Sequence, residues 1–222
     1  MFNINDFLFL IPARKNSKGI KNKNFLRINK KYLIEYTFDK IKNISSNKKF
    51  ILTDSKFGKY LAKKYDINCS YIRPKYLSLD HTSLLENIIH FDNQLGQSID
   101  FKYYVILQPT SPLRTKKDIF EALKILNKKK LESLYSISPS FEHPCDTLII
   151  NKKKIKPFQS KNISRRQLYP ESFYINGAIY VFNKKLLETN NIISKKNHGY
   201  YIMKKISSID LDDYQDLDIL KK

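Results

Sequence analysis

The stretch IPARKNSKGIKNKN at residues 11–24 continues an apolar run, FLFLI, at residues 7–11. The apolar run predicts a buried strand, and the loop after it holds one glycine, one serine, one arginine and four lysines. In α/β proteins, backbone N–H groups and cations gather beyond the carboxyl ends of strands and hold phosphate there. The sequence therefore predicts an α/β fold with a site for a phosphorylated small molecule, although the loop taken alone also fits a solvated basic turn.

This loop does not carry either of the common phosphate-binding motifs. The sequence contains no G-x-x-x-x-G-K-[ST] and no G-x-G-x-x-G. P-loop NTPases and ordinary dinucleotide-binding proteins therefore lose support.

Strand and helix patterns alternate through the first 130 residues. Strands are expected at 7–11, 49–53, 69–72 and 103–107. Helical spacing of apolar residues predicts helices at 32–43, 55–65, 82–95 and 115–129. This alternation predicts a mostly parallel sheet with helices on both faces.

The alternation ends near residue 132. Strands are expected at 134–138, 147–151 and 178–182 without long helices between them, and a last helix at 213–221. Residues 139–177 are therefore interpreted as an arm or hairpin that leaves the core. No linker to a second domain is visible, so residues 1–222 are predicted to form a single domain.

The composition is globular and strongly basic. Hydrophobic residues make up 41% of the 222 residues, and the formal net charge is +20. Residues 14–31 hold eight cations and no acid, and residues 152–166 hold seven cations and no acid. Both stretches fit sites for polyanions as well as solvated loops. Because lysines occur in nearly every segment, no basic stripe stands out, and we expect no nucleic-acid partner.

Other function classes are excluded by what the sequence lacks. Cys69 and Cys145 are far apart and form no C-x-x-C, so a disulfide framework and a zinc–thiolate site are not expected. No apolar run approaches the ~20 residues of a membrane span. No cationic segment precedes the first apolar run, so a signal peptide is not expected. We expect a cytoplasmic protein without a membrane partner.

Two prolines fix the backbone of QPTSPLR at residues 108–114, directly after the expected strand 103–107. This rigid turn presents Gln108, Thr110 and Ser111 at the sheet edge where α/β proteins bind ligands. Thr115 fits the N-cap of the following helix, and this role is compatible with ligand binding at Gln108.

A second loop pattern joins Arg73 and Pro74 to the triplet DHT at residues 80–82. Aspartate is a favoured helix N-cap, so Asp80 taken alone is interpreted as the cap of the helix at 82–95.

The segment RRQLYPESFYINGAIYVF occupies residues 165–182. Guanidinium groups bind carboxylates and phosphates through paired N–H donors, so Arg165 and Arg166 are candidate ligand-binding residues. An isolated arginine pair also commonly faces solvent.

Asp210 and Asp212 form a D-x-D motif near the C-terminus. In an extended segment, residues two apart point to the same side, separated by ~6–7 Å of chain rise. Two such carboxylates suit magnesium, which proteins hold through one or two carboxylates together with phosphates and water. Alternatively, the two acids favour the N-terminus of the helix at 213–221.

Together these stretches resemble the CMP-sialic acid synthetases, or N-acylneuraminate cytidylyltransferases. The family's opening signature, I-x-A-R-x-x-S-K-G-x-x-x-K-N, is matched at Ala13, Arg14, Ser17, Lys18, Gly19, Lys23 and Asn24. The element L-Q-P-T-S-P-L-R matches at all eight positions of residues 107–114. The R-P, R-R-Q and D-x-D elements follow the family's order, so the resemblance covers about residues 7 to 220.

The resemblance implies a Rossmann-like three-layer nucleotidyltransferase fold with a mostly parallel mixed sheet and a protruding dimerisation arm. It implies a cytidylyltransferase that joins CTP to a nonulosonic acid, N-acetylneuraminic acid or a close relative, and releases pyrophosphate. It also implies a magnesium cofactor and a homodimer in which the arm at 139–177 reaches over the neighbour's site.

The resemblance also assigns the site residues. The nucleotide would be bound by Arg14, Asn16, Ser17, Lys23, Asn24, Arg73, Asp80 and Thr82. The sugar would be bound by Gln108, Arg166, Asn176 and Tyr180. Magnesium would be held by Asp210 and Asp212. The catalytic residues would be Arg14, Lys23 and Asp212.

Some positions differ from the family pattern. Sialate enzymes often carry a lysine where Asp146 stands, a basic residue where Tyr174 stands, and two aromatic residues in the segment that holds residues 192–194 here. These positions concern the sugar, so legionaminic acid or another modified nonulosonic acid is the nearest alternative acceptor. CMP-KDO synthetases fit less well, because their opening signature lacks the S-K-G-x-x-x-K-N arrangement.

Two alternatives lie outside active enzymes. A nucleic-acid-binding basic protein would explain the net charge of +20 but neither QPTSPLR nor the D-x-D motif. A catalytically weakened regulatory relative is disfavoured by the presence of Lys23 and both aspartates.

Overall fold

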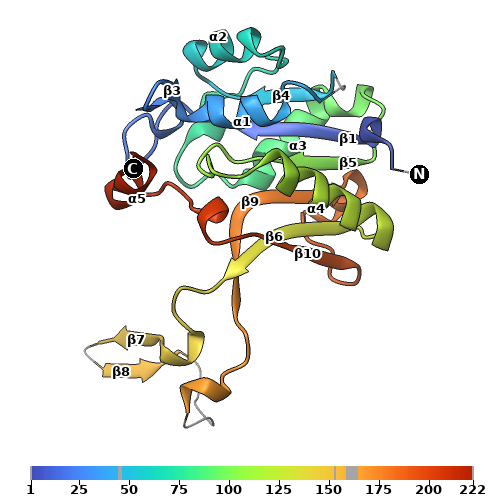
Figure 1. Cartoon of the computed structure of the whole chain (residues 1–222). Coiled ribbons are helices and arrows are strands. Elements are labelled where there is room, and N and C mark those ends of the chain that lie inside the picture. The colour runs from blue at the N-terminus through green and yellow to red at the C-terminus, as the bar shows by residue number, and fades with distance from the viewer. Residues whose placement is uncertain (1, 45–46, 153, 159–164, 222) are drawn as a thin grey trace.

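A six-stranded sheet forms the middle layer of the molecule in a computed structural model that describes residues 2–44, 47–152, 154–158 and 165–221 (Figure 1). The order across the sheet is β10-β6-β9-β5-β1-β4. These strands are β1 Phe7–Pro12, β4 Lys49–Leu52, β5 Tyr103–Ile106, β6 Ser133–Pro139, β9 Phe173–Asn183 and β10 His198–Ile202. Strand β9 runs antiparallel to both of its neighbours, and the other neighbouring pairs are parallel. The predicted α/β fold with a mostly parallel mixed sheet is confirmed.

Helices cover both faces of the sheet. They are α1 Leu33–Ile41, α2 Lys56–Lys64, α3 Leu84–Gln94, α4 Lys116–Lys129 and α5 Tyr214–Lys221. Successive side chains of a strand point to opposite faces, so β1 divides its apolar residues between two cores. Phe7 and Phe9 pack with α1, α2 and α4, whereas Leu8 and Leu10 pack with α3. Because every residue at 7–11 is at most 1% exposed, β1 anchors both faces and fixes where its carboxyl end emerges.

The loop after β1 packs against the C-terminal segment. It contains a small antiparallel pair, β2 Arg27–Ile28 and β3 Lys31–Tyr32. Ile20 joins Leu211 and Leu217 in a third apolar cluster, which brings α5 beside this loop (Figure 1). The first and last functional motifs of the sequence are thereby placed side by side.

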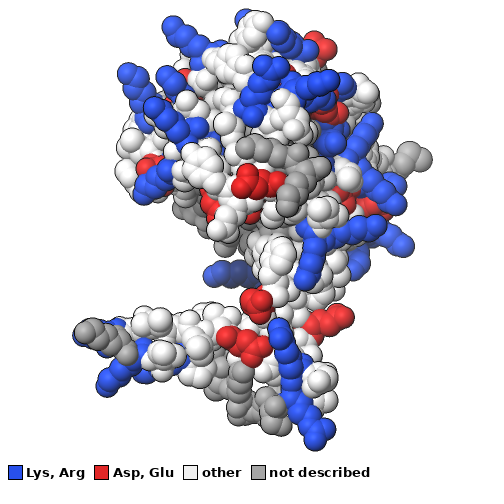
Figure 2. All heavy atoms as spheres, turned by 60° about the vertical axis from the view of Figure 1, so that its left-hand side comes forward, with Lys and Arg blue, Asp and Glu red and all other residues white. Residues whose placement is uncertain are grey.

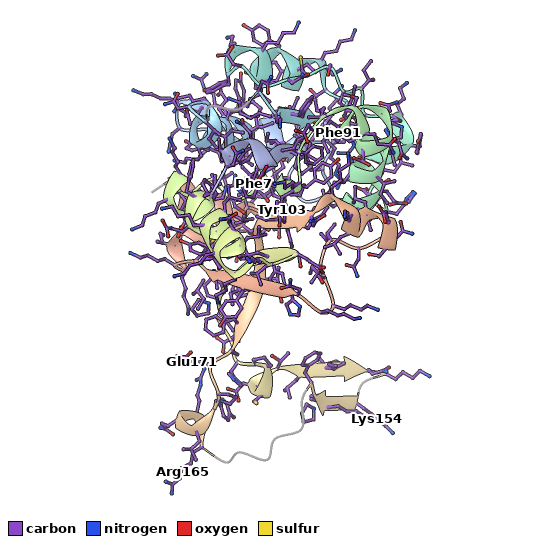
Figure 3. The ribbon with its side chains drawn as sticks, turned by 90° about the vertical axis from the view of Figure 1, so that its right-hand side faces the viewer. Phe7, Phe91, Tyr103, Lys154, Arg165 and Glu171 are labelled. Carbon is purple, nitrogen blue, oxygen red and sulfur yellow. The ribbon has the colours of Figure 1, made fainter. Side chains whose placement is uncertain are left out.

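An arm leaves the sheet between the end of β6 and the start of β9 (Figure 1). It carries an antiparallel hairpin, β7 Leu148–Asn151 and β8 Lys154–Pro157, in which every residue is exposed. Figure 3 shows Lys154, Arg165 and Glu171 on this arm, apart from the packed side chains around Phe7, Phe91 and Tyr103. Because β9 begins at Phe173, the predicted arm of 139–177 includes residues that belong to the sheet.

Most of the predicted elements form where the sequence places them, but one predicted strand is absent and strands β2, β3, β8 and β10 were not predicted. The strand predicted at 69–72 is wrong: next to β4 there is only an isolated bridge, between Phe50 and Asn68. The Asn68 side chain then accepts a hydrogen bond from the Ser70 N–H, which turns the chain away from the sheet. Strand β10 was not predicted. It lies at the edge of the sheet, where its residues are only exposed or half-buried, so no buried apolar run marks it in the sequence.

Charge is spread widely over the surface. Figure 2 shows lysine and arginine side chains distributed over the body and on the arm, with no continuous basic stripe on this face. None of the helices that the structure describes is both long enough and apolar enough to span a membrane.

Candidate active site

A cavity of about 440 Å³ opens at the carboxyl ends of β1 and β5. It is lined by four groups of residues: the loop after β1, the segment before α3, the turn after β5, and the D-x-D segment. Its walls include Arg14, Ser17, Lys18, Lys23, Asn24, Arg73, Asp80, Thr82, Gln108, Thr110, Asp210 and Asp212. The structure thus brings together residues that the sequence separates by up to 198 positions, counted from Arg14 to Asp212. Of the residues predicted to bind the nucleotide, Asn16 is the exception, since it is exposed and does not line the cavity.

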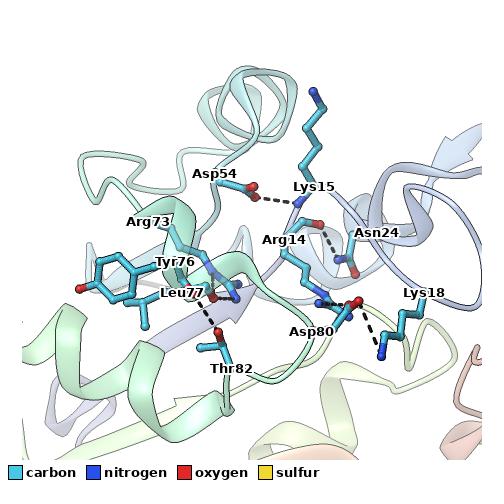
Figure 4. Close-up of polar contacts among 10 residues, drawn as sticks. All are labelled: Arg14, Lys15, Lys18, Asn24, Asp54, Arg73, Tyr76, Leu77, Asp80 and Thr82. Carbon is cyan, nitrogen blue, oxygen red and sulfur yellow. Dashed lines mark hydrogen bonds and ion pairs between the residues drawn. The ribbon is translucent and has the colours of Figure 1, made fainter.

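The loop after β1 is held by polar contacts at its ends (Figure 4). The Lys15 N–H donates to Asp54 Oδ1 at 2.7 Å, and Asn24 Nδ2 donates to the Arg14 carbonyl at 3.0 Å. Gly19 lies against the D-x-D segment, where a Cβ would stand 2.7 Å from the Asp212 carbonyl oxygen. A side chain at this position would separate the basic loop from the aspartates.

Asp80 faces the cavity cations instead of capping a helix. Its carboxylate accepts a hydrogen bond from Arg14 Nη1 at 2.6 Å and lies 3.8 Å from Lys18 Nζ (Figure 4). Helix α3 is capped by Ser83, whose hydroxyl accepts from the Glu86 N–H while the Glu86 carboxylate accepts from the Ser83 N–H. The interpretation of Asp80 as the helix cap is therefore wrong, and its charge balances the basic loop.

The segment before α3 is shaped by Arg73. This arginine is 7% exposed, and both Nε and Nη2 donate to the Leu77 carbonyl (Figure 4). Burial lowers the pKa of its guanidinium. Thr82 donates to the Tyr76 carbonyl at 3.0 Å. Both predicted nucleotide-binding residues line the cavity, and their hydrogen bonds in the structure hold the fold of its wall.

The two aspartates of the D-x-D segment face the same cavity in different environments. Lys23 Nζ donates to Asp212 Oδ1 at 2.8 Å, and the Asp212 side chain is 74% exposed. Asp210 is largely buried, and its Oδ1 has no hydrogen-bond partner. Burial is the main cause that raises the pKa of the Asp210 carboxyl, and Asp212 raises it further, against a hydrogen bond from Thr110. Backbone pairing of the Leu211 N–H with the Thr110 carbonyl at 2.8 Å fixes this segment beside the turn after β5.

A different aspartate accepts the hydrogen bonds at the start of α5. Asp213 Oδ1 accepts hydrogen bonds from the N–H groups of Gln215 at 2.8 Å and Asp216 at 3.0 Å. The D-x-D carboxylates are thus not used for these helix-start bonds and remain directed at the cavity.

The donor set fits a magnesium ion that is completed by a ligand. Among the residues that the structure describes, no group of three or more His, Cys, Asp or Glu side chains gathers to hold a metal alone. Asp210 and Asp212 supply two carboxylates on one cavity wall, and one carboxylate oxygen of Asp210 is buried without a partner. Magnesium commonly takes one or two carboxylates and fills its remaining positions with phosphate oxygens and water.

The turn after β5 is fixed by a buried arginine whose role the sequence did not reveal. Arg114 is 1% exposed and donates to the carbonyls of Gln108 at 3.1 Å and Ala178 at 2.6 Å, and to the Thr37 hydroxyl at 2.8 Å. Complete burial lowers its pKa to about 9, so it stays protonated at neutral pH. Gly177 has φ of 74°, and a Cβ there would stand 3.3 Å from Gln108 Oε1. Glycine suits position 177 best, because another residue would be strained at this φ and its Cβ would crowd the Gln108 side chain.

Two further cavity residues were given no role from the sequence. Lys18, although part of the S-K-G motif, lies within ion-pair distance of Asp80. Asn87 in α3 is 2% exposed and donates to the Ser83 carbonyl at 2.9 Å, while its Oδ1 has no partner. No residue pattern around Asn87 in the sequence marks it as a cavity residue.

The residues predicted to bind the sugar are dispersed. Gln108 lines the cavity, but Asn176 is buried in the sheet, where its amide bonds the hydroxyls of Ser136 and Ser138. Tyr180 lies opposite Ile106 on the neighbouring strand, and burial, followed by the charge of Asp210, raises the pKa of its phenol. Neither Asn176 nor Tyr180 lines the cavity.

Arg166 lies on the arm and not at the cavity of its own chain. Its side chain is 71% exposed, and its guanidinium stands 3.6 Å from Glu142 and 3.7 Å from Asp146. From this position Arg166 could make the predicted sugar contact only in the site of a second copy of the chain.

Comparison of the sequence with known protein families identifies the family of this chain. Residues 8–218 match the family described as cytidylyltransferase. The chain belongs to the cytidylyltransferase family. It is therefore a nucleotidyltransferase, and the cavity at the carboxyl ends of β1 and β5 is its candidate active site.

Several curated relatives of this cytidylyltransferase share about 30% of its residues. Post-translational flagellin modification protein B of Campylobacter coli is 29% identical, over 98% of this chain and 94% of the relative. CMP-N,N′-diacetyllegionaminic acid synthase of Campylobacter jejuni is 29% identical, over 97% of this chain and 94% of the relative. N-acylneuraminate cytidylyltransferase of Escherichia coli O18:K1:H7 is 31% identical over 95% of this chain, which spans 50% of that relative's length.

Solved structures show the same fold. A structure of CMP:2-keto-3-deoxy-manno-octonic acid synthetase complexed with CTP has a TM-score of 0.71 at 13% identity and covers 97% of this chain and 96% of that chain. A 4-diphosphocytidyl-2C-methyl-D-erythritol synthase from Anaerococcus prevotii has a TM-score of 0.66 at 13% identity, covering 98% and 97%. At these identities the likeness concerns the fold alone.

Proposed function

We propose that this cytidylyltransferase transfers the cytidylyl group of CTP to the anomeric hydroxyl of a nonulosonic acid. The hydroxyl oxygen attacks the α-phosphorus and gives up its proton to water, the bond from the α-phosphorus to the β-phosphate oxygen breaks, and pyrophosphate leaves with that electron pair. The observation that carries the proposal is a cavity in which the basic loop and the D-x-D carboxylates face one another.

The basic loop supplies charge for the triphosphate. Arg14 and Lys18 lie at Asp80, and Lys23 lies at Asp212, so each cation is held by a carboxylate at the cavity wall. A triphosphate can take the place of these carboxylates as the anionic partner. We assign Lys23 to the leaving pyrophosphate, where positive charge lowers the free energy of the transition state.

Magnesium completes the proposed site. Asp210 and Asp212 would hold the ion, which supplies positive charge for the phosphate oxygens and lowers the pKa of a nearby hydroxyl. Burial disfavours the charged form of Asp210, so a cation beside it would relieve an unfavourable charge.

We propose that the acceptor is a nonulosonic acid because the relatives' names include synthases for such sugar acids. The sequence predicts N-acetylneuraminic acid or a close relative, with legionaminic acid as the alternative. The printed names of the relatives include both kinds of acceptor, so they do not select one.

We also propose a homodimer. The hairpin of the arm exposes Ile149, Ile150 and Ile155, at 47%, 74% and 65%, and no residue of its two strands β7 and β8 is buried. Exposed apolar clusters of this kind mark protein contacts. Ile150→Asp should convert a dimer to a monomer in multi-angle light scattering. Lys152→Asp, a substitution at a polar position on the same hairpin, is the control and should leave the dimer intact. A monomeric wild-type protein would contradict the proposal.

The scattered cations argue against a nucleic-acid-binding role. Specific binding of that kind needs cations gathered along the track of the phosphates. The cations of the cavity wall are instead paired with carboxylates inside a hollow. The cytoplasmic location that the sequence predicts is kept as part of this proposal.

The test is pyrophosphate release by the full chain with magnesium, a nonulosonic acid and each of CTP, UTP and ATP. We expect release with CTP and a preference over UTP and ATP of at least about 100-fold, as for sites that read a hydrogen-bonding group of the substrate. Equal release from UTP or ATP would contradict cytidylyl transfer. Omitting the sugar acid is the control for simple CTP hydrolysis.

A further inference from the structure

The outward side of helix α2 combines cations with aromatic rings. The helix has the sequence KFGKYLAKK and packs on the body through its small and apolar residues, which are buried on one side. The helical repeat of ~3.6 residues per turn places five exposed residues together on the other side: Lys56, Phe57, Tyr60, Lys63 and Lys64. No acidic residue stands on this helix. These five residues, here named the α2 face, are therefore all cationic or aromatic.

The rings of the α2 face are held in place by neighbouring rings. The Phe57 ring centroid lies 4.9 Å from that of Tyr32 and 6.3 Å from that of Tyr60. The Phe25 ring packs beneath the helix, where a Cβ on Gly58 would stand 2.8 Å from it. The exposed parts, 39% of Phe57 and 54% of Tyr60, are thus presented on a fixed aromatic base.

The cations of the α2 face are available to an outside anion. In the described part of the chain, no carboxylate lies within ion-pair distance of Lys56, Lys63 or Lys64. The Lys64 ammonium stands 4.5 Å from the centroid of the Tyr60 ring, so charge and ring form one surface. The cations of the candidate active site are instead paired with carboxylates.

The shape of the α2 face favours a bilayer over a strand of nucleic acid. Figure 1 shows α2 on the outside of the body, at the end opposite the arm. Nucleic-acid strands are held by rings on which bases stack, whereas Phe57 and Tyr60 stack on each other, with 25° between their ring planes. A bilayer accommodates a convex face of this kind, because aromatic side chains enter the boundary between headgroups and acyl chains.

We infer that the α2 face binds reversibly to the surface of an anionic lipid bilayer. The lysines would lie at the headgroups, and the Phe57 and Tyr60 rings would lie at the headgroup level, where tyrosine is enriched in membrane proteins. Such binding is independent of the proposed transfer reaction. The sequence predicts no membrane partner because it lacks a spanning segment, but contact with a bilayer surface needs no such segment.

The position of a cation decides whether it contributes to this binding. At 0.1 M salt, cations within ~10 Å of the bilayer attract it, and those farther away are largely screened. Each lysine close to anionic lipids is worth about 5-fold in affinity. The side of the molecule that faces the bilayer therefore matters more than the net charge of +20.

The first experiment measures sedimentation of the full chain with vesicles at 0.1 M salt. One kind of vesicle holds equal parts of phosphatidylglycerol and phosphatidylcholine, and the other holds phosphatidylcholine alone. We expect binding to be at least about 10-fold tighter to the anionic vesicles. The double variant Lys63→Gln, Lys64→Gln should weaken that binding by at least about 10-fold.

The matched control removes the same charge from another helix. Lys128 and Lys129 are exposed in the last turn of α4, as Lys63 and Lys64 are in the last turn of α2. Figure 1 shows α4 apart from α2. The double variant Lys128→Gln, Lys129→Gln should bind anionic vesicles within about 2-fold of the wild type. Thermal unfolding of both double variants verifies that they are folded.

A fluorescence experiment locates the contact. The chain contains no tryptophan, so a single introduced tryptophan reports only on its own position. Anionic vesicles should shift the emission of Tyr60→Trp to shorter wavelength. Tyr200→Trp on the edge strand β10 is the control, since Tyr200 is exposed to a similar extent, 57%, and its emission should stay unchanged.

The outcomes test the α2 face directly. Failure to bind anionic vesicles, or equal binding to both kinds, overturns the inference. Equal weakening by the two lysine pairs means that net charge alone attracts the protein, and the assignment to α2 is then wrong. It is also wrong if the α2 lysine pair affects binding of single-stranded oligouridylate but not of vesicles. An emission shift in Tyr200→Trp with none in Tyr60→Trp would place β10 at the bilayer instead.

Discussion

The body and the arm of this cytidylyltransferase differ in how far their strands are buried. Strand β1 of the body is buried from Phe7 to Ile11, whereas every residue of the arm hairpin, β7 and β8, is exposed. The body is therefore stabilised by its own cores, which also position the candidate active site. The apolar residues of the arm hairpin stay exposed in the described part of the chain, which is typical of a segment that contacts a partner.

The charged groups differ in the same way. In the body, Arg14 and Lys23 lie 2.6 Å and 2.8 Å from carboxylates at the cavity wall. On the arm, Arg166 lies 3.6 Å and 3.7 Å from its acidic neighbours and is 71% exposed. Substitution of a paired cation at the cavity wall should therefore act on turnover, and substitution of Arg166 on the arm should act on acceptor binding.

The largest effect is expected for Asp212→Asn. It should lower kcat on the order of 10²–10³-fold, because one charged ligand that stabilises the reacting phosphates is lost. The side chain is 74% exposed, so the melting temperature should change little. Steady-state kinetics over a range of magnesium concentrations measures the effect. If Asp212→Asn kept the turnover of the wild type at low magnesium, this aspartate would not be a metal ligand.

Lys23→Ala should lower kcat by about 10²-fold, because a cation near the leaving pyrophosphate is removed. Lys21→Ala is the matched control, since Lys21 is exposed on the same loop and does not line the cavity. Kinetics and thermal unfolding are measured on both variants. A shifted melting temperature with unchanged kinetics for Lys23→Ala would assign this lysine to folding alone.

Arg166→Lys should raise KM for the sugar acid by an amount equivalent to ~1.5–3 kcal/mol, with KM for CTP nearly unchanged. Lysine keeps the charge but loses the paired N–H donors that match a carboxylate. Arg165→Lys is measured in parallel, because a shift of one residue would exchange their roles. If neither variant alters KM for the sugar acid, the arm does not contact the acceptor.

The smallest effect is on stability. Asp210→Asn should raise the melting temperature of the magnesium-free protein. Burial raises the pKa of this carboxyl, which means that its charged form is disfavoured in the folded protein at neutral pH. The same variant should lose most of its turnover. Calorimetry in magnesium-free buffer that shows a lowered melting temperature would contradict this account of Asp210.

The sequence predicted the body well where local patterns decide the structure. The apolar run at 7–11 can only be satisfied by burial on both faces, and Thr115 caps α4 as its position before the helix predicts. Asp80 was misread because the capping box of Ser83 and Glu86, also visible in the sequence, is the stronger helix start.

Other features depend on contacts between distant segments and could not be predicted. Arg114 acquires its role from the carbonyls of Gln108 and Ala178, which only the pairing of β5 with β9 brings together. The cleft lined by Phe141, Tyr174 and Ile219 likewise forms where the base of the arm meets α5, and neither segment indicates it alone. Asn176, predicted to bind the sugar, is instead bonded to serines of the neighbouring strand β6.

Phosphorus NMR of one reaction mixture tests the central claim most directly. The mixture contains the full chain, magnesium, CTP, N-acetylneuraminic acid and N,N′-diacetyllegionaminic acid, and it is followed over time. We expect the CTP resonances to decline while one phosphodiester resonance and pyrophosphate grow in equal amounts, and we expect both products to require the sugar acid. Unchanged CTP, or the appearance of CDP and inorganic phosphate without a phosphodiester, would contradict cytidylyl transfer by this protein.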